Sequence, residues 1–173
     1  MSPLKNLGEF FSQDARELKL SELPDFVQSF VQHVEPGSWF FLNGDLGAGK
    51  TLFVSEVAQT LGAAGLATSP TFALLQTHPL PEAFLGFQKI IHLDLYRLKK
   101  GNELCYLGLE TEFTASALAF FEWAELVSHD DWEQFFLVTG CLRPAAIWEI
   151  QIAPAHSADA RLYSLLDRSE LLL

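Results

Sequence analysis

The residues of this chain that most directly imply chemistry form one glycine-rich segment. In order they are Gly44, Asp45, Leu46, Gly47, Ala48, Gly49, Lys50 and Thr51. The segment fits G-x-x-x-x-G-K-[ST], the phosphate-binding P-loop. Its glycines let the backbone curl around an anion and point N–H groups at phosphate oxygens. We therefore expect a nucleotide's phosphates on residues 44–51, with Lys50 on the β- and γ-phosphates and the Thr51 hydroxyl on Mg²⁺.

A P-loop needs a strand before it and a helix after it, and both are visible in the sequence. Residues 39–42 are continuously apolar, as expected for a strand buried on both faces. After the loop, apolar residues recur at helical spacing until Gly62: Leu52, Phe53, Val54, Val57 and Leu61. The alternative, a glycine-rich turn with an incidental lysine, leaves this flanking pattern unexplained.

Hydrolysis or phosphoryl transfer also requires an acidic group on Mg²⁺ and a group that positions the nucleophile. Two apolar segments end in such an acid: residues 89–94 end at Asp94, and residues 117–122 end at Glu122. Ligand sites of parallel sheets lie at the carboxyl ends of the strands, so both acids are candidates. Either could instead be a solvated residue at a strand end.

The remaining pattern predicts an α/β, P-loop NTPase-like, three-layer fold with a mostly parallel sheet and antiparallel flanking strands. We expect one domain over residues 1–173, with residues 1–17 at its periphery. Further expectations are an edge strand at 18–20, a helix with Ser21 as N-cap, a strand at 73–75, a loop at 79–86, a helix at 101–113 and a closing hairpin at 146–152 and 161–166. Residues 132–138 are ambiguous between helix and strand.

Composition limits the possible partners and compartments. The 173 residues carry 11 Lys and Arg against 22 Asp and Glu, a net charge of −11. The affinity of proteins for nucleic acids comes largely from Lys and Arg contacts with phosphates, so we expect no strong direct binding to RNA or DNA. No apolar stretch reaches the ~18 residues of a membrane span. Two isolated cysteines and the lack of an apolar leader favour the cytoplasm, and the five histidines show no zinc-like spacing.

Several P-loop classes leave motifs that this sequence lacks. It has no Asn-Lys-x-Asp or Asp-x-x-Gly motif of GTPases and no Leu-Ser-Gly-Gly-Gln motif of transport ATPases. Its five arginines form no cluster suited to a nucleotide-kinase lid. Three functions stay open: an ATPase subunit, a small-molecule kinase, and a nucleotide-dependent binding module with negligible hydrolysis.

Four motifs in fixed order resemble the TsaE (YjeE) family over about residues 21–166. They are the P-loop, Ser-Pro-Thr-Phe at 69–72, His-Leu-Asp-Leu-Tyr-Arg-Leu at 92–98, and Glu-Trp at 122–123. This family is a bacterial P-loop ATPase that acts with the TsaB and TsaD proteins to make N6-threonylcarbamoyladenosine (t6A) in tRNA. The resemblance implies ATP or ADP and Mg²⁺ as cofactors, TsaB and TsaD as partners, and weak hydrolysis by the chain alone.

The same resemblance assigns roles to single residues. It implies Lys50 as the phosphate lysine and, with Glu122 and Asp94, a catalytic residue. Thr51 and Glu122 correspond to the metal ligands, and Asp94 to an aspartate that supports hydrolysis or metal binding. Trp123 matches a family tryptophan, which could equally be a core aromatic. Ser69 and Thr71 match a nucleotide-sensing switch, or else form a local turn.

The sequence departs from the family pattern at three places without losing a phosphate or metal ligand. Leu52 replaces a second threonine, Ser55-Glu56 replaces Arg-Gly, and His78 stands near a usual tyrosine. The second departure removes a positive charge near the P-loop, which puts a contact of that arginine with a partner in doubt.

Overall fold

The computed structural model describes residues 7–8, 10–11, 15–64 and 74–172 of the chain, and its described strands form one seven-stranded sheet. The strands are β1 (Arg16–Lys19), β2 (Trp39–Asn43), β3 (Leu75–Phe84), β4 (Phe87–Asp94), β5 (Ala117–Glu122), β6 (Ile147–Pro154) and β7 (Ala160–Asp167). Their order across the sheet is β1-β7-β6-β2-β5-β4-β3.

Four parallel strands make up the centre of the sheet. β2 lies between β5 and β6 and pairs in parallel with both, and β4 pairs in parallel with β5. The flanks are antiparallel: β3 pairs with β4 on one side, and β7 and β1 follow β6 on the other. The expected parallel sheet with antiparallel flanks is confirmed, as are the edge strand near residue 18 and the closing hairpin.

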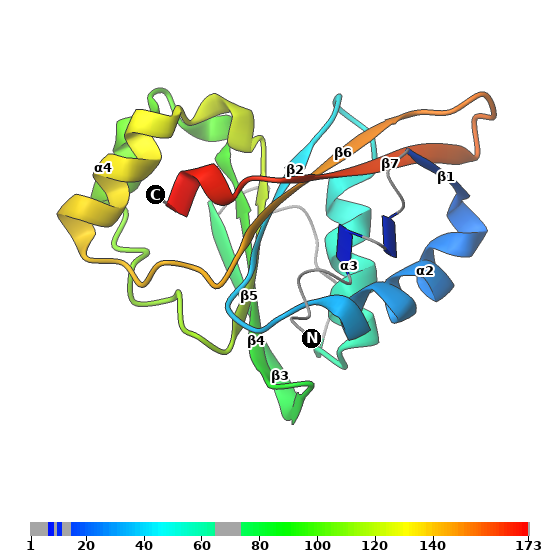
Figure 1. Ribbon diagram of the computed structural model, residues 1–173, viewed down its shortest axis with the longest axis horizontal. Helices are drawn as coiled ribbons and strands as arrows, with labels where there is room; N and C mark the ends of the chain where they lie inside the picture. Colours follow the sequence, from blue (N-terminus) through cyan, green and yellow to red (C-terminus); the bar gives the residue numbers. More distant parts are fainter. Residues whose placement is uncertain (1–6, 9, 12–14, 65–73, 173) are drawn as a thin grey trace.

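Helices cover both faces of this sheet (Figure 1). α2 (Leu23–Phe30) and α3 (Lys50–Thr60) lie on one face, and α4 (His129–Thr139) lies on the other. A separate apolar cluster fills each interface, with Phe30, Phe53 and Phe120 in the first and Trp39, Phe121 and Trp132 in the second. Burial of such aromatic side chains contributes roughly 1.5–3 kcal/mol each to folding. The result is the three-layer arrangement expected of a P-loop fold.

Part of the N-terminal segment belongs to the core. Leu7 and Phe11 are almost fully buried in the cluster on the α2 and α3 face. The Phe11 ring meets the rings of Phe26 and Phe30 edge-on. These contacts attach the described parts of residues 1–17 to α2.

Local signals explain how the helices begin and end. Ser128 caps α4 by accepting a hydrogen bond from the Asp131 N–H, and Gly140 ends the helix with a φ of 66°. This helix resolves the ambiguity of residues 132–138. The expected N-cap at Ser21 is wrong, because Ser21 lies within a 3-10 helix (Leu20–Glu22) and α2 begins only at Leu23, with Glu22 as its N-cap.

Two further expectations are corrected. Residues 79–84 continue strand β3 instead of forming a loop, and the turn is confined to Leu85 and Gly86. The prolines at 79 and 81 are tolerated because β3 is an edge strand, where an absent N–H breaks no inner ladder. The expected helix at 101–113 is only a 3-10 helix (Gly101–Tyr106) followed by turns. The expected strand at 73–75 lies partly outside the described residues, and β3 begins at Leu75.

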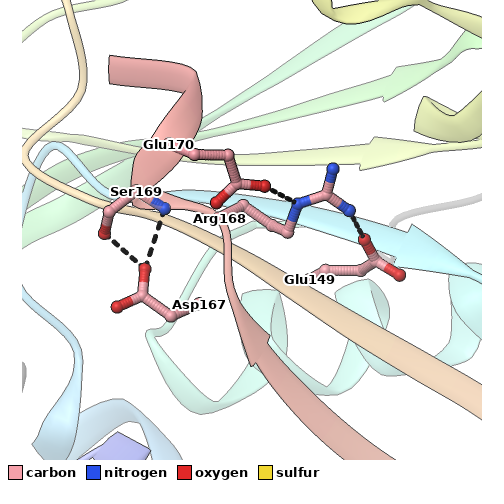
Figure 2. Close-up of polar contacts among 5 residues, drawn as sticks. All are labelled: Glu149, Asp167, Arg168, Ser169 and Glu170. Atoms are coloured by element: carbon pink, nitrogen blue, oxygen red, sulfur yellow. Dashed lines mark hydrogen bonds and ion pairs between the residues drawn. The ribbon is translucent and has the colours of Figure 1, made fainter. Parts of the chain in front are cut away.

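Arg168 fastens the C-terminal segment to the sheet (Figure 2). Its guanidinium donates to the Glu149 carboxylate on β6 and, at 2.6 Å, to Glu170. The Asp167 carboxylate accepts from the N–H and hydroxyl of Ser169, which opens the 3-10 helix Ser169–Leu172. The two carboxylates together raise the pKa of Arg168 despite its partial burial.

Three further short 3-10 helices are Val31–His33, Leu95–Arg97 and Ala124–Leu126, and the described residues 7–8 and 10–11 are also helical. Among the described residues, no helix combines the length and the apolar character needed to cross a membrane.

Candidate nucleotide site

The glycine-rich loop joins the end of β2 to the start of α3, as the sequence predicts. Gly44 has a φ of 148°, and a Cβ placed there would lie 2.3 Å from the Ile152 carbonyl oxygen of β6. Only glycine fits this approach, because the oxygen belongs to backbone and cannot swing away. Gly47 and Gly49 have φ values of 79° and 109°, the left-handed region that glycine adopts without strain. The loop conformation therefore depends on its glycines.

Lys50 opens α3 and is 4% exposed. Its ammonium donates to the carbonyl oxygens of Gly44, at 2.6 Å, and Asp45, at 3.0 Å. Burial lowers the pKa of Lys50, against the opposing effect of nearby carboxylates, of which Glu122 is the strongest. The side chain thus curls back over the loop, where a phosphate would be held.

Thr51 and Glu122 meet across the gap between α3 and β5. The Thr51 hydroxyl donates to Glu122 Oε1 at 2.7 Å, although 71 positions separate the two residues. Glu122 is the last residue of β5 and is 4% exposed. A hydroxyl and a carboxylate are oxygen ligands of the kind that Mg²⁺ takes beside phosphates and water. The two residues expected to hold the metal are therefore in direct contact.

Asp94 lies beside Glu122 at the same edge of the sheet. It is the last residue of β4, and its backbone is in register with that of Glu122. Its Oδ1 accepts a hydrogen bond from the Tyr96 N–H at 3.1 Å and so caps the 3-10 helix Leu95–Arg97. Asp94 thus has a structural contact of its own and is also placed at the candidate site.

These residues line a cavity of about 270 Å³ at the carboxyl ends of the parallel strands. It is lined by Leu46, Gly47, Ala48, Gly49, Lys50, Thr51, Leu52, Asp94, Tyr96, Glu122 and Trp123. A second cavity, of about 310 Å³, lies on the other face among Asn43, Glu125, Glu149 and Arg168. Its two glutamates would repel phosphate, and its arginine is already paired. The first cavity is therefore the candidate phosphate site.

The donor set of the first cavity fits a nucleotide and Mg²⁺. It offers a buried ammonium, the N-terminal end of α3, a hydroxyl and two carboxylates. Within the loop, the Ala48 N–H donates to the Asp45 carbonyl at 3.0 Å. Among the described residues, no group of three or more His, Cys, Asp or Glu side chains could hold a metal alone.

Three contacts at the site were not predicted from the sequence. His92, quoted only as part of a motif, lies beneath the site with Nε2 2.8 Å from Glu122 Oε1. Arg161 of β7 donates to the Ala48 carbonyl at 3.2 Å. Trp123 has a φ of 60°, and its ring lies over the Lys50 ammonium. Strand alternation places His92 on the same face as Asp94, two residues later, but it does not show that the ring meets Glu122.

The switch-like motif at Ser69 to Phe72 lies outside the described residues. The three departures from the family pattern all lie among the described residues, and His78 is on β3. Leu52, which lines the cavity, is 41% exposed, whereas Ser55 and Glu56 follow further along α3.

The sheet order, the loop between β2 and α3, and the acids at the neighbouring strand ends together define a P-loop fold. The solved crystal structure of YdiB from Bacillus subtilis has this fold in common with the chain, at a TM-score of 0.58 and 24% sequence identity. The superposition covers 90% of this chain and 88% of that one.

Sequence comparison identifies the family. The family model described as threonylcarbamoyl adenosine biosynthesis protein TsaE matches residues 18–156. A TsaE protein of tRNA threonylcarbamoyladenosine biosynthesis from Rickettsia bellii is 40% identical over 109 residues, which are 62% of this chain and 72% of that protein. Its namesake from Bacillus subtilis is 37% identical over 93 residues, or 54% of each chain. The chain belongs to the TsaE family.

Proposed function

We propose that this protein is a Mg²⁺-dependent ATPase subunit that acts in the biosynthesis of t6A in tRNA together with TsaB and TsaD. The observation that carries the proposal is the 2.7 Å hydrogen bond from Thr51 to Glu122. It joins the first turn of the P-loop helix to the acid at the end of β5, which is the pair of ligands that a nucleotide-bound Mg²⁺ needs.

In this proposal the loop and Lys50 bind ATP or ADP. The N–H groups at the start of α3 and in the loop face the phosphate oxygens, and the ammonium moves from the carbonyls of Gly44 and Asp45 to the β- and γ-phosphates. Thr51 and Glu122 would hold Mg²⁺. When bound, this ion neutralises charge on the β- and γ-oxygens.

Asp94 has the second acidic role. Its carboxylate lines the same cavity and lies on the strand next to Glu122. We assign it to orient the attacking water or to accept its proton, a role that contributes about 10²–10⁴-fold to a rate. The turn of residues 94–96 restrains the aspartate, because one of its oxygens is bonded to the Tyr96 N–H.

The assignment to t6A biosynthesis rests on the family to which the chain belongs. The net charge of −11 is unfavourable for binding a polyanion such as tRNA. We assign the RNA-binding surface to a partner and the nucleotide-driven step to this chain. A partner that completes the site would also explain the lack of an arginine cluster in the sequence, since a group supplied in trans can add about 10³–10⁵ in rate.

The proposal is tested by following radiolabelled ATP with the purified chain, alone and with TsaB and TsaD. We expect slow release of inorganic phosphate by the chain alone, faster release with the partners, and t6A in tRNA only when all are present. Label that moves from ATP to a small molecule would instead identify a kinase. Nucleotide binding without turnover, even with partners present, would identify a non-hydrolysing binding module.

A separate titration tests the placement of the RNA contact. In a filter-binding experiment at physiological salt, the chain alone should not retain tRNA. Sub-micromolar binding that falls steeply with added salt would contradict the assignment of RNA binding to a partner.

A further inference from the structure

A buried histidine extends the Thr51–Glu122 contact into the sheet. His92 of β4 is fully buried, and its Nε2 lies 2.8 Å from Glu122 Oε1. The same carboxylate oxygen accepts the Thr51 hydroxyl at 2.7 Å. One oxygen of Glu122 is therefore held from two sides, by the P-loop helix and by the neighbouring strand.

The geometry determines which ring nitrogen carries the proton. Nε2 faces a carboxylate oxygen, so it must donate. Nδ1 is buried and has no hydrogen-bond partner among the described residues. A doubly protonated ring would leave an N–H donor at Nδ1 without an acceptor, which costs about 1–3 kcal/mol or more. The neutral ring with its proton on Nε2 leaves an unpaired acceptor at Nδ1 instead of an unpaired donor, and it donates a charge-assisted bond to Glu122.

The apolar surroundings of His92 do not by themselves require a histidine at position 92. Two apolar residues lie near His92 on the same face of the sheet. Ile90 is two residues earlier on β4, and Phe120 is the register partner of His92 on β5. An apolar side chain at position 92 would continue this cluster without an unpaired nitrogen. The polar contact that the imidazole makes is the one to Glu122.

We propose that His92 is a positioning residue that fixes the Glu122 carboxylate for Mg²⁺ and so tunes metal affinity. The inference rests on the proposed function, since it assumes that Glu122 is a metal ligand. Groups that hydrogen-bond to metal ligands affect metal affinity or activity by about 10–100-fold when they are removed. His92 stands in that relation to Glu122, and it contributes no ligand itself.

Two substitutions of His92 distinguish its role in positioning Glu122 from a role in packing. His92→Leu fills a similar space but removes the donor, whereas the amide nitrogen of His92→Gln can replace Nε2. His78 is the matched control: it lies on β3, its ring also has a buried, unpartnered nitrogen, and burial lowers its pKa. In the described structure no bond joins His78 to Glu122, so His78→Leu tests the effect of removing a neighbouring histidine from the same sheet.

The readout is calorimetric titration of Mg²⁺ into each ADP-loaded variant, together with ADP binding in the presence of EDTA. For His92→Leu we expect Mg²⁺ affinity to fall by about 10–100-fold with metal-free ADP binding unchanged, near-wild-type values for His92→Gln, and no change for His78→Leu. Equal Mg²⁺ affinity in wild type and His92→Leu would overturn the inference. No Mg²⁺-dependent binding by the wild type would instead overturn the proposed function.

A measurement on the unmodified chain keeps the inference testable even if His92→Leu does not fold. Long-range ¹H–¹⁵N spectra of the histidine rings report which nitrogen is protonated. We expect His92 to carry its proton on Nε2, and we expect this signal to move on Glu122→Gln substitution while the His78 signal stays. A proton on Nδ1, or a His92 signal that is insensitive to Glu122, would overturn the inference.

Discussion

The Lys50 ammonium lies 3.9 Å from the centroid of the Trp123 ring. Trp123 presents its ring there because its backbone adopts a φ of 60°, a left-handed conformation that bulky residues rarely take. A cation over an indole face gains about 0.5–2 kcal/mol. Lys50 is thus held by the ring as well as by the carbonyls of Gly44 and Asp45. A bound phosphate would compete with both.

This contact predicts a fluorescence signal. Nucleotide binding should change the emission of Trp123, because the ammonium over its ring moves toward the phosphates. Trp123→Phe should lose that change while retaining ADP binding within about tenfold, since Phe keeps a weaker cation–π contact. Trp148→Phe is the control, because Trp148 is buried in the other apolar cluster. An ADP-induced change of equal size in Trp123→Phe would contradict the prediction.

Substitutions of Glu122 and of Asp94 should impair different steps, nucleotide binding with Mg²⁺ and hydrolysis respectively. Glu122→Gln should weaken Mg²⁺-dependent nucleotide binding, because it removes a charged ligand. Asp94→Asn should leave ADP binding and stability near wild type, since Asn caps as well as Asp, but should slow hydrolysis by about 10²–10⁴-fold. Calorimetry and phosphate release measure the two effects. The reverse pattern would mean that the roles are exchanged, and no effect in either variant would make both acids structural.

Two glycines of the loop should respond differently to alanine. Gly44→Ala should destabilise the protein by several kcal/mol or prevent folding, since its Cβ would lie 2.3 Å from the Ile152 carbonyl oxygen. Gly47→Ala meets nothing within 4 Å, so its cost should be the left-handed strain of about 1–2 kcal/mol. Urea unfolding compares the two. A Gly44→Ala protein as stable as Gly47→Ala would refute the close approach of the loop to β6.

Stability should fall at alkaline pH. Burial raises the pKa of Tyr163 from 10.0 to about 12 and that of Cys141 from 9.0 to about 12. The fold therefore favours their protonated forms. Their contribution is complete below the unfolded values and is lost as the pH rises through the folded values. For Tyr163 the loss approaches roughly 3 kcal/mol.

Chemical denaturation at a series of pH values measures this loss. The free energy of unfolding should decrease from about pH 9 to about pH 12, and more gently in Tyr163→Phe, which keeps the ring but cannot ionise. The same decrease in both proteins would show that Tyr163 does not contribute.

Local patterns in the sequence were enough for the central elements. The apolar run at 39–42, the run that ends at Glu122 and the helical spacing after Thr51 are short-range signals, and they predicted β2, β5 and α3. The path of β3 could not be predicted this way. Prolines at 79 and 81 resemble a loop until the sheet order shows that they lie on an edge strand.

The candidate site shows the same difference between short-range and long-range signals. Its loop was visible because eight consecutive residues define it, but its polar contacts join distant residues. Thr51 and Glu122 are 71 positions apart, and His92 and Glu122 are 30 apart. Whether such side chains meet depends on strand order and register, which a single sequence does not specify. For this reason His92 had no role until the fold placed it beneath Glu122.

The central claim is that the phosphates of ATP or ADP bind at Lys50. Its most direct test is calorimetric titration of ADP with Mg²⁺ into the wild type, Lys50→Ala and Lys100→Ala, the last removing an exposed lysine elsewhere. Each charge-assisted bond lost contributes about 1.5–3 kcal/mol, so Lys50→Ala should bind roughly 10- to 150-fold more weakly, while Lys100→Ala stays at the wild-type value. Unchanged affinity in Lys50→Ala, with the protein folded, would contradict the assignment of the phosphate site.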